Sequence, residues 1–240
     1  MKPTGLQKRS SNRRRSDSGT QWTYRHDLVL FGQLLHKRHY ISGVDGNLSV
    51  RLDSTRVLTT PTGMSKGFMK PADMVVVDLD GERVSGTHKP SSELEMHLTI
   101  YKLRPDVGAV IHAHPCTATG FASSGLGLTE AVCSELVLTL GGVPLAEYAL
   151  PGSAELSESL RPFIRSHDAI LMENHGVVAY GATLMQAYLN MESVEHSAMI
   201  MLVTKIIGRA NTLSEKEVGR LLARRSKDRS LVQPSVAEMM

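Results

Sequence analysis

Apolar and polar residues follow two different spacings along this chain, one typical of helices and the other of strands. Leu28, Phe31, Leu34 and Leu35 recur at helical spacing and predict a helix over residues 24–39. Further helical patterns, each with an apolar face, occupy residues 91–104, 154–164, 183–207 and 215–226. Short apolar runs broken by turn residues predict strands within residues 47–52, 56–60, 74–80, 107–114, 139–150 and 169–181.

The order of these elements predicts the fold class. Residues 139–150 have the pattern of a strand pair around Gly141-Gly142, and residues 169–181 have the pattern of two strands split at His175-Gly176. The other strands and helices alternate, which favours an α/β fold with helices on both faces of a mixed sheet. A chain of 240 residues can build a single core, so we expect one main domain.

The charge is distributed unevenly. Overall 27 Lys and Arg stand against 24 Asp and Glu, a net charge of +3. Residues 1–20 contribute six basic side chains, one acidic one and no aromatic ring, so the remainder has a net charge of −2. We expect a disordered basic tail over residues 1–22, a folded domain over 23–225 and a C-terminal tail over 226–240. A solvated tail is favoured over a nucleic-acid or localisation role for the arginines.

Cysteine usage and hydropathy indicate a reducing compartment. Cys116 and Cys133 are the two cysteines of the chain, too few for a disulfide framework. No run approaches the ~18 consecutive apolar residues of a membrane-spanning helix. The first residues also lack the apolar stretch of a secretory signal. We expect a cytoplasmic protein with neither a membrane nor a nucleic-acid partner.

The sharpest chemical signal is a pair of histidines in an apolar strand. His112 and His114 are two residues apart, so both rings emerge on the same face of a strand. Two adjacent buried imidazoles need a partner, and zinc is the commonest one. His175 is the best candidate for a third ligand, because it ends an apolar strand and precedes Gly176, which permits a turn. A lone strand histidine is more often a core residue, but the third histidine favours a metal site.

A second signal lies at the start of a predicted helix, which begins near Ser91 or Ser92 and continues through Glu93. Two hydroxyls and the free N–H groups of a first turn suit a phosphate, because the helix dipole and the unpaired donors both favour an anion. An ordinary N-cap explains the same residues equally well. Glycine-containing loops at 45–49 and 60–63 could complete an anion site, although each alone is more typical of a structural turn.

Five short motifs occur in the order and approximate spacing of one protein family. They are G-N-L-S at 46–49, T-P-T-G at 60–63, P-S-S-E at 90–93, H-A-H-P at 112–115 and N-H-G at 174–176. Together they resemble the class II aldolase/adducin family, and the resemblance extends from about residue 24 to residue 207.

This resemblance implies a fold, a cofactor and a set of site residues. The implied fold is a three-layer α/β/α arrangement with a central mixed, mostly antiparallel sheet. Members of this kind are usually homotetramers with sites between subunits. The implied site has zinc, or another divalent metal such as manganese or cobalt, on His112, His114 and His175, a phosphate cradle of Asn47, Thr62, Gly63, Ser91 and Ser92, and an acid/base at Glu93.

The resemblance also implies a reaction. The leading hypothesis is an aldolase that cleaves a ketose 1-phosphate, such as L-fuculose 1-phosphate or a 5-deoxypentulose 1-phosphate, to dihydroxyacetone phosphate and a small aldehyde. Aldolases of this kind commonly carry a tyrosine where this chain has Cys133 and Ser134, so the proton donor on the aldehyde side stays open. The alternatives are a sugar-phosphate dehydratase or epimerase, and an adducin-like interaction domain without catalysis. The three histidines and Glu93 favour an enzyme.

Overall fold

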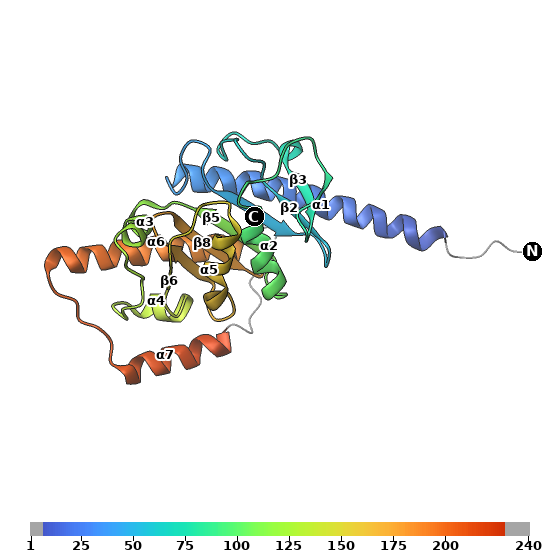
Figure 1. Ribbon diagram of the computed structural model, residues 1–240. Helices are drawn as coiled ribbons and strands as arrows, with labels where there is room; N and C mark the ends of the chain where they lie inside the picture. The colour runs from blue at the N-terminus through green and yellow to red at the C-terminus, as the bar shows by residue number, and fades with distance from the viewer. Residues whose placement is uncertain (1–6, 229–240) are drawn as a thin grey trace, which may run out of the picture.

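A single eight-stranded sheet runs through the centre of the molecule (Figure 1). The computed structural model describes residues 7–228, with side chains from 21 to 225. Neighbouring strands are antiparallel except β6 and β7, which are parallel. In sheet order the strands are β4 Arg83–Ser85, β3 Val75–Asp78, β2 Arg56–Thr59, β1 Asn47–Arg51, β5 Ala109–Ala113, β8 Gly176–Gly181, β7 Ala169–Met172 and β6 Leu145–Ala146.

Helices cover both faces of this sheet, which confirms the three-layer α/β/α fold. Strand β5 shows why both faces are covered: Ile111 faces one apolar core with α1, α3 and α6, and Val110 faces a second core with α2 and α5. None of the helices in the described part of the chain is long and apolar enough to cross a membrane. The helices are α1 Gln7–Lys37, α2 Leu94–Leu103, α3 Cys116–Ser123, α4 Ser134–Thr139, α5 Ala154–Ile164, α6 Leu184–Ile207 and α7 Glu215–Asp228, with a short 3-10 helix at Pro71–Asp73.

The first helix is longer than the sequence pattern predicts. It ends at Lys37, but it begins at Gln7, inside the stretch 1–22 that we expected to be disordered. Once its buried part has nucleated a helix, each further residue is added at little cost, and residues 7–18 contain neither glycine nor proline. Residues 1–6 and the part of the expected C-terminal tail from 229 to 240 lie outside the described residues.

Two other predicted elements differ from the structure, and β4, α3 and α4 were not predicted. Helix α2 begins at Leu94 and not near Ser91 or Ser92, because Glu93 has φ −102° and ψ 17°, outside the helical region. Residues 139–150 form no strand pair: the helix α4 ends at their start, and the strand β6 is two residues long. A short apolar run cannot be assigned to a strand or a buried helix from its spacing alone.

The middle of the sheet places the residues that the sequence singled out. Strand β5 lies between β1 and β8, with His112 opposite Asn47 on one side and opposite Val178 on the other. Because β5 and β8 are antiparallel, the end of β5 lies beside the start of β8. The β7–β8 connection, which carries His175, therefore reaches the same end of the sheet as His114.

Candidate active site

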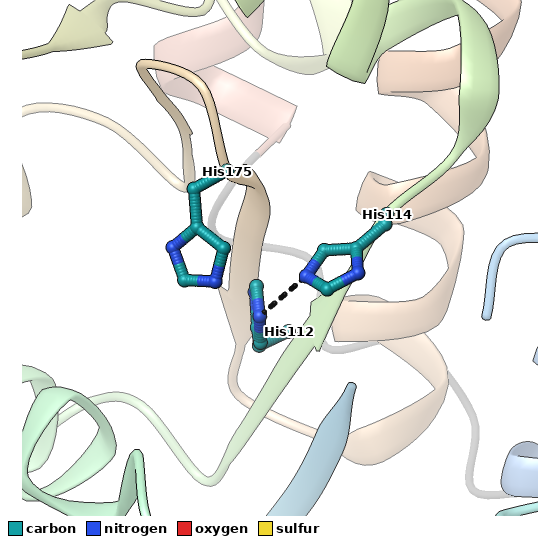
Figure 2. Close-up of side chains that lie close together, drawn as sticks. All are labelled: His112, His114 and His175. Atoms are coloured by element: carbon teal, nitrogen blue, oxygen red, sulfur yellow. Dashed lines mark hydrogen bonds between the residues drawn. The ribbon is translucent and has the colours of Figure 1, made fainter. Parts of the chain in front are cut away.

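Three histidine rings converge at the end of β5 (Figure 2). Nε2 of His112 and Nε2 of His114 are 3.0 Å apart. The ring centre of His175 lies 4.7 Å from that of His112 and 5.3 Å from that of His114. One nitrogen of each ring lies within 4.8 Å of the other two. The structure thus brings together the three histidines that the sequence pattern selected.

Polar contacts on the outer side of the rings decide which ring nitrogens point toward the space between the three histidines. Nδ1 of His112 donates to the carbonyl oxygen of Val177 at 2.9 Å, since a carbonyl can only accept. The other ring nitrogen of His112, Nε2, is therefore the one that faces His114. Nδ1 of His114 lies 3.7 Å from the carboxylate of Asp45. A carbonyl or carboxylate behind the ring is the usual environment of a metal-binding imidazole.

Gly176 makes room for His114. We expected Gly176 to permit a turn, but the residue with positive φ in this connection is Asn174, at 52°, and Gly176 begins β8. A Cβ atom on Gly176 would lie 2.3 Å from Cδ2 of His114 and 2.8 Å from the carbonyl oxygen of Ala113. The ring of His114 therefore occupies the space that any other side chain at position 176 would take.

The carboxylate of Glu93 reaches two of the three rings. Its Oε2 lies 3.3 Å from Nε2 of His112, and its Oε1 lies 3.1 Å from Nε2 of His175. Nδ2 of Asn47 donates to Oε2 at 2.9 Å. Glu93 occupies the N-cap position of α2, yet its side chain makes no capping hydrogen bond. The side chain therefore belongs to the histidine cluster and does not cap the helix.

Burial and neighbouring charges set the protonation states of the cluster. Burial alone raises the pKa of Glu93, but His112 and His175 outweigh burial and hold that pKa well below its ordinary value. Burial, followed by the nearby rings of His112 and His175, lowers the pKa of His114 to about 4. Near neutral pH Glu93 is ionised and His114 is neutral, as a cation-binding site requires.

The donor set fits a divalent metal ion. Oε1 of Glu93 and Nδ1 of His175 are buried, and apart from the contact of Oε1 with Nε2 of His175 at 3.1 Å neither has a polar partner among the described residues. A buried anionic oxygen with so few partners is costly, and a cation beside it removes the cost. Imidazole nitrogens are common ligands of zinc and of neighbouring divalent metals. His112, His114 and His175 are therefore a candidate metal centre.

The segments expected to bind phosphate lie side by side near this centre. An isolated bridge pairs Pro61 with Pro90. The N–H of Thr62 donates to the carbonyl oxygen of Lys89 at 3.1 Å, so the T-P-T-G loop runs beside the residues that precede α2. Asn47 joins the same region through its hydrogen bond to Glu93. Three segments that are far apart in the sequence thus meet beside the histidines.

These segments present both exposed and buried polar groups. Thr62, Gly63 and Ser92 are exposed, and Gly63 has a φ of 67° with open space where a Cβ would be. Oδ1 of Asn47 is buried and has no hydrogen-bond partner among the described residues. Oγ of Ser91 accepts the N–H of Glu93 at 3.3 Å, a local turn contact that precedes α2, so the N-cap that we considered as an alternative is not formed by Ser91.

Two acidic residues near the centre gave no clear signal in the sequence. Asp45, which lies beside His114, looked like part of an ordinary turn. Glu195, in the long helix α6, accepts the N–H groups of Thr117 and Ala118 at 3.0 and 2.8 Å. It thereby caps α3, the helix that follows His114 directly. The capping contact joins residues 78 positions apart, so no local pattern could reveal it.

Fold and site together define an α/β protein with a candidate metal centre at the end of its central strands. Residues 26–202 match the family model described as Class II Aldolase and Adducin N-terminal domain. The chain belongs to this family, and within it resembles L-fuculose phosphate aldolases.

Curated relatives include two kinds of enzyme. The L-fuculose phosphate aldolase of Methanococcus maripaludis is 36% identical over 174 residues, 72% of this chain and 93% of that protein. The 5-deoxy-D-ribulose 1-phosphate aldolase of Bacillus thuringiensis is 33% identical over 198 residues, 82% of this chain and 92% of that protein. The 3-oxo-tetronate 4-phosphate decarboxylase of Pectobacterium atrosepticum is 36% identical over 183 residues, 75% of this chain and 84% of that protein.

Solved structures agree with the sequence relatives. The structure of an L-fuculose 1-phosphate aldolase superposes with a TM-score of 0.79 at 32% identity, covering 84% of this chain and 95% of the other. The similarity confirms the class II aldolase fold and supports an enzyme of the lyase class.

Proposed function

We propose that this protein is a metal-dependent aldolase that cleaves a ketose 1-phosphate to dihydroxyacetone phosphate and a small aldehyde. L-Fuculose 1-phosphate and a 5-deoxypentulose 1-phosphate are the candidate substrates, as the names of two relatives suggest. The observation that carries the proposal is the ionised Glu93 carboxylate, 3.1–3.3 Å from two of three converging histidines and beside the loops expected to bind phosphate.

The histidines would hold the metal. His112, His114 and His175 supply three imidazole nitrogens, and zinc is the metal that such a set most often binds. When bound, a divalent ion supplies Lewis acidity for the negative charge that develops on oxygen during carbon–carbon cleavage. Manganese or cobalt is the alternative ion. The hydrogen bond from His112 to Val177 fixes one ring in the orientation that this task needs.

The phosphate cradle would orient the substrate. Asn47, Thr62, Gly63, Ser91 and Ser92 come from the three segments that meet beside Glu93. Binding a phosphate there would place the adjacent carbon chain over the histidines, and such positioning lowers the barrier at the reacting carbons. An unphosphorylated ketose should therefore lose most of its kcat/KM.

Glu93 would move the proton at carbon. Cleavage breaks the C3–C4 bond of the ketose: the C4 hydroxyl gives its proton to solvent as the aldehyde forms, and the electron pair passes to the C3 side as an enediolate. Glu93, which is ionised in the free enzyme, takes up one proton from solvent and gives it to C3, which becomes the hydroxymethyl carbon of dihydroxyacetone phosphate. In the reverse direction the carboxylate removes that proton. Without substrate the same carboxylate is near enough to contact the metal.

Glu93→Gln tests this role directly. Hydrogen–deuterium exchange at the hydroxymethyl carbon of dihydroxyacetone phosphate requires Glu93 and no aldehyde. The variant should exchange ~10²–10⁴-fold more slowly than the wild type, because a positioned acid or base usually accelerates a proton transfer by that factor. Glu95→Gln is the matched control, because Glu95 is an exposed carboxylate in the first turn of α2 and should leave exchange unchanged. Metal content is measured on every sample. A metal-replete Glu93→Gln protein that exchanges at the wild-type rate would reject the assignment.

A second candidate follows from the decarboxylase relative. That protein is named for 3-oxo-tetronate 4-phosphate, and loss of carbon dioxide from such a 3-oxo acid leaves the same enediolate as the aldol cleavage. Incubation with each substrate separates the two: an aldehyde identifies the aldolase and carbon dioxide the decarboxylase. A dehydratase or epimerase would release no dihydroxyacetone phosphate, and an adducin-like interaction domain would turn over neither substrate. The homotetramer and the cytoplasmic location remain predictions.

A further inference from the structure

Lys66 is a buried cation that the proposed reaction does not use. Its side chain lies in the segment between β2 and the 3-10 helix, and the residue is 2% exposed. Lysine is almost never fully buried unless its charge is compensated. Nζ of Lys66 donates to the carbonyl oxygen of Val44 at 2.6 Å and to that of Met64 at 2.8 Å. Both partners are main-chain groups, so the ammonium binds loops and not another side chain.

These two carbonyls belong to the two loops that flank the expected phosphate cradle. Val44 stands three residues before Asn47, and Met64 follows Gly63 directly. The backbone of Lys66 is itself fixed against α1, because a Cβ on Gly32 would lie 2.9 Å from the carbonyl oxygen of Lys66. Lys66 therefore links the two loops to each other, and its own backbone packs closely against α1.

The charge of Lys66 also lies close to the site. Burial lowers the pKa of Lys66 to about 8, against the opposing effect of the Asp45 and Glu93 carboxylates, so the ammonium is still mostly protonated at pH 7. The five cradle residues are all neutral. A phosphate monoester carries up to two negative charges, and a fixed cation behind a neutral cradle would favour its binding.

We propose that Lys66 is a positioning residue for the phosphate group of the substrate. It holds the loop before Asn47 and the loop around Gly63 in the arrangement that receives phosphate, and it supplies the buried positive charge behind them. This inference rests on the proposed function, because it takes the ligand of these loops to be a phosphate monoester.

The test compares two probes on the metal-loaded, full-length protein. Inorganic phosphate reports the cradle, and acetohydroxamate, a phosphate-free chelator, reports the metal centre. Lys66→Met should bind phosphate at least about tenfold more weakly, since at an effective dielectric near 20 a unit charge within roughly 12 Å of a singly charged anion contributes that much or more. Its affinity for acetohydroxamate, which binds a metal as a singly charged anion without using the cradle, should fall much less. Lys66→Arg, which keeps the charge, should recover most of the phosphate affinity. Lys89→Met is the control, because Lys89 is an exposed lysine beside the same loops.

The outcomes separate this inference from the proposed function. Wild-type phosphate affinity in a folded Lys66→Met protein overturns the inference alone. Equal loss of both probes overturns it as well, because Lys66 would then support the whole site and not the phosphate. If Lys66→Met fails to fold, Lys66→Gln replaces it, with two N–H donors and no charge. A wild-type protein that binds acetohydroxamate and no phosphate overturns the cradle itself, and with it the phosphorylated substrate.

Discussion

Replacing Gly176 by alanine should remove the metal without unfolding the protein. The added Cβ would lie 2.3 Å from Cδ2 of His114, where an ordinary contact begins at 3.4 Å. The His114 ring must therefore retreat by about 1.1 Å. The carbonyl oxygen of Ala113, 2.8 Å away, belongs to the neighbouring strand, so the backbone of β5 must shift as well.

A shift of this size is large for a metal ligand. Metal–nitrogen distances are held to within about 0.2 Å, so His114 would no longer reach an ion held by His112 and His175. Weaker perturbations, in groups that only orient a ligand, already reduce metal affinity about 10–100-fold. We expect a reduction at or beyond the upper end of that range. The φ of Gly176 adds no strain of its own, because Gly176 is not among the residues with positive φ, but the close contact with the carbonyl oxygen of Ala113 should also lower the stability of the fold.

Zinc affinity measured by competition with a chelator, together with circular dichroism and urea unfolding, checks this prediction. Gly120→Ala is the matched control: Gly120 lies in α3, where nothing is within 4 Å of an added Cβ. That variant should keep its affinity for the metal. Its free energy of unfolding should rise by about 0.5–1 kcal/mol, because alanine lowers the conformational entropy of the unfolded chain. A folded Gly176→Ala protein with wild-type zinc affinity would refute the placement of the metal at the His114 ring.

Two further predictions concern buried polar groups around the site. Glu195→Gln should lower the free energy of unfolding by about 1–2 kcal/mol in urea, because it weakens a charged cap on the N–H groups of Thr117 and Ala118; an unchanged value would contradict the capping role. Burial lowers the pKa of His97 to about 3, from 6.5 in the unfolded chain, so the unfolded state takes up the proton first as pH falls. The contribution of neutral His97 to the free energy of unfolding is complete above pH 6.5 and declines by about 1.4 kcal/mol per pH unit below it. Urea unfolding at several pH values should therefore show a shallower loss of stability for His97→Gln than for the wild type. Equal slopes would argue against a neutral buried His97.

The sequence predicted the strands whose apolar runs are visible without any tertiary information. Strands β3, β5, β7 and β8 are almost continuously apolar, as strands buried on both faces usually are. Strand β4 was not predicted, because its three residues are exposed. The position of His112 and His114 on the same face could also be predicted from neighbouring residues alone, since alternate residues of a strand share a face. The approach of His175 depends on the antiparallel pairing of β5 with β8, which its place at a strand end could suggest but not establish.

The errors have a common physical origin in tertiary contacts. Ser91 and Ser92 are both good N-cap residues, but Glu93 is drawn toward His112 and His175, and the helix starts after it. Gly176 looked like a turn residue, because a glycine that makes room for a ring cannot be distinguished in sequence from one that needs a positive φ. No pattern in the sequence singled out Lys66, because its burial depends on contacts with loops from two separate segments.

The proposed site residues all act on the same half of the substrate. The cradle would hold the phosphate, the histidines would lie beneath the adjacent carbonyl, and Glu93 would meet the carbon that becomes the hydroxymethyl group. Aldol cleavage and decarboxylation both leave this fragment, and they differ only in the group that departs. Relatives with such a site can therefore catalyse either reaction, as an aldolase and a decarboxylase that are each 36% identical to this chain illustrate. Proton exchange into dihydroxyacetone phosphate reports the step common to both reactions, so it tests the roles of Glu93 and the cradle independently of the departing group.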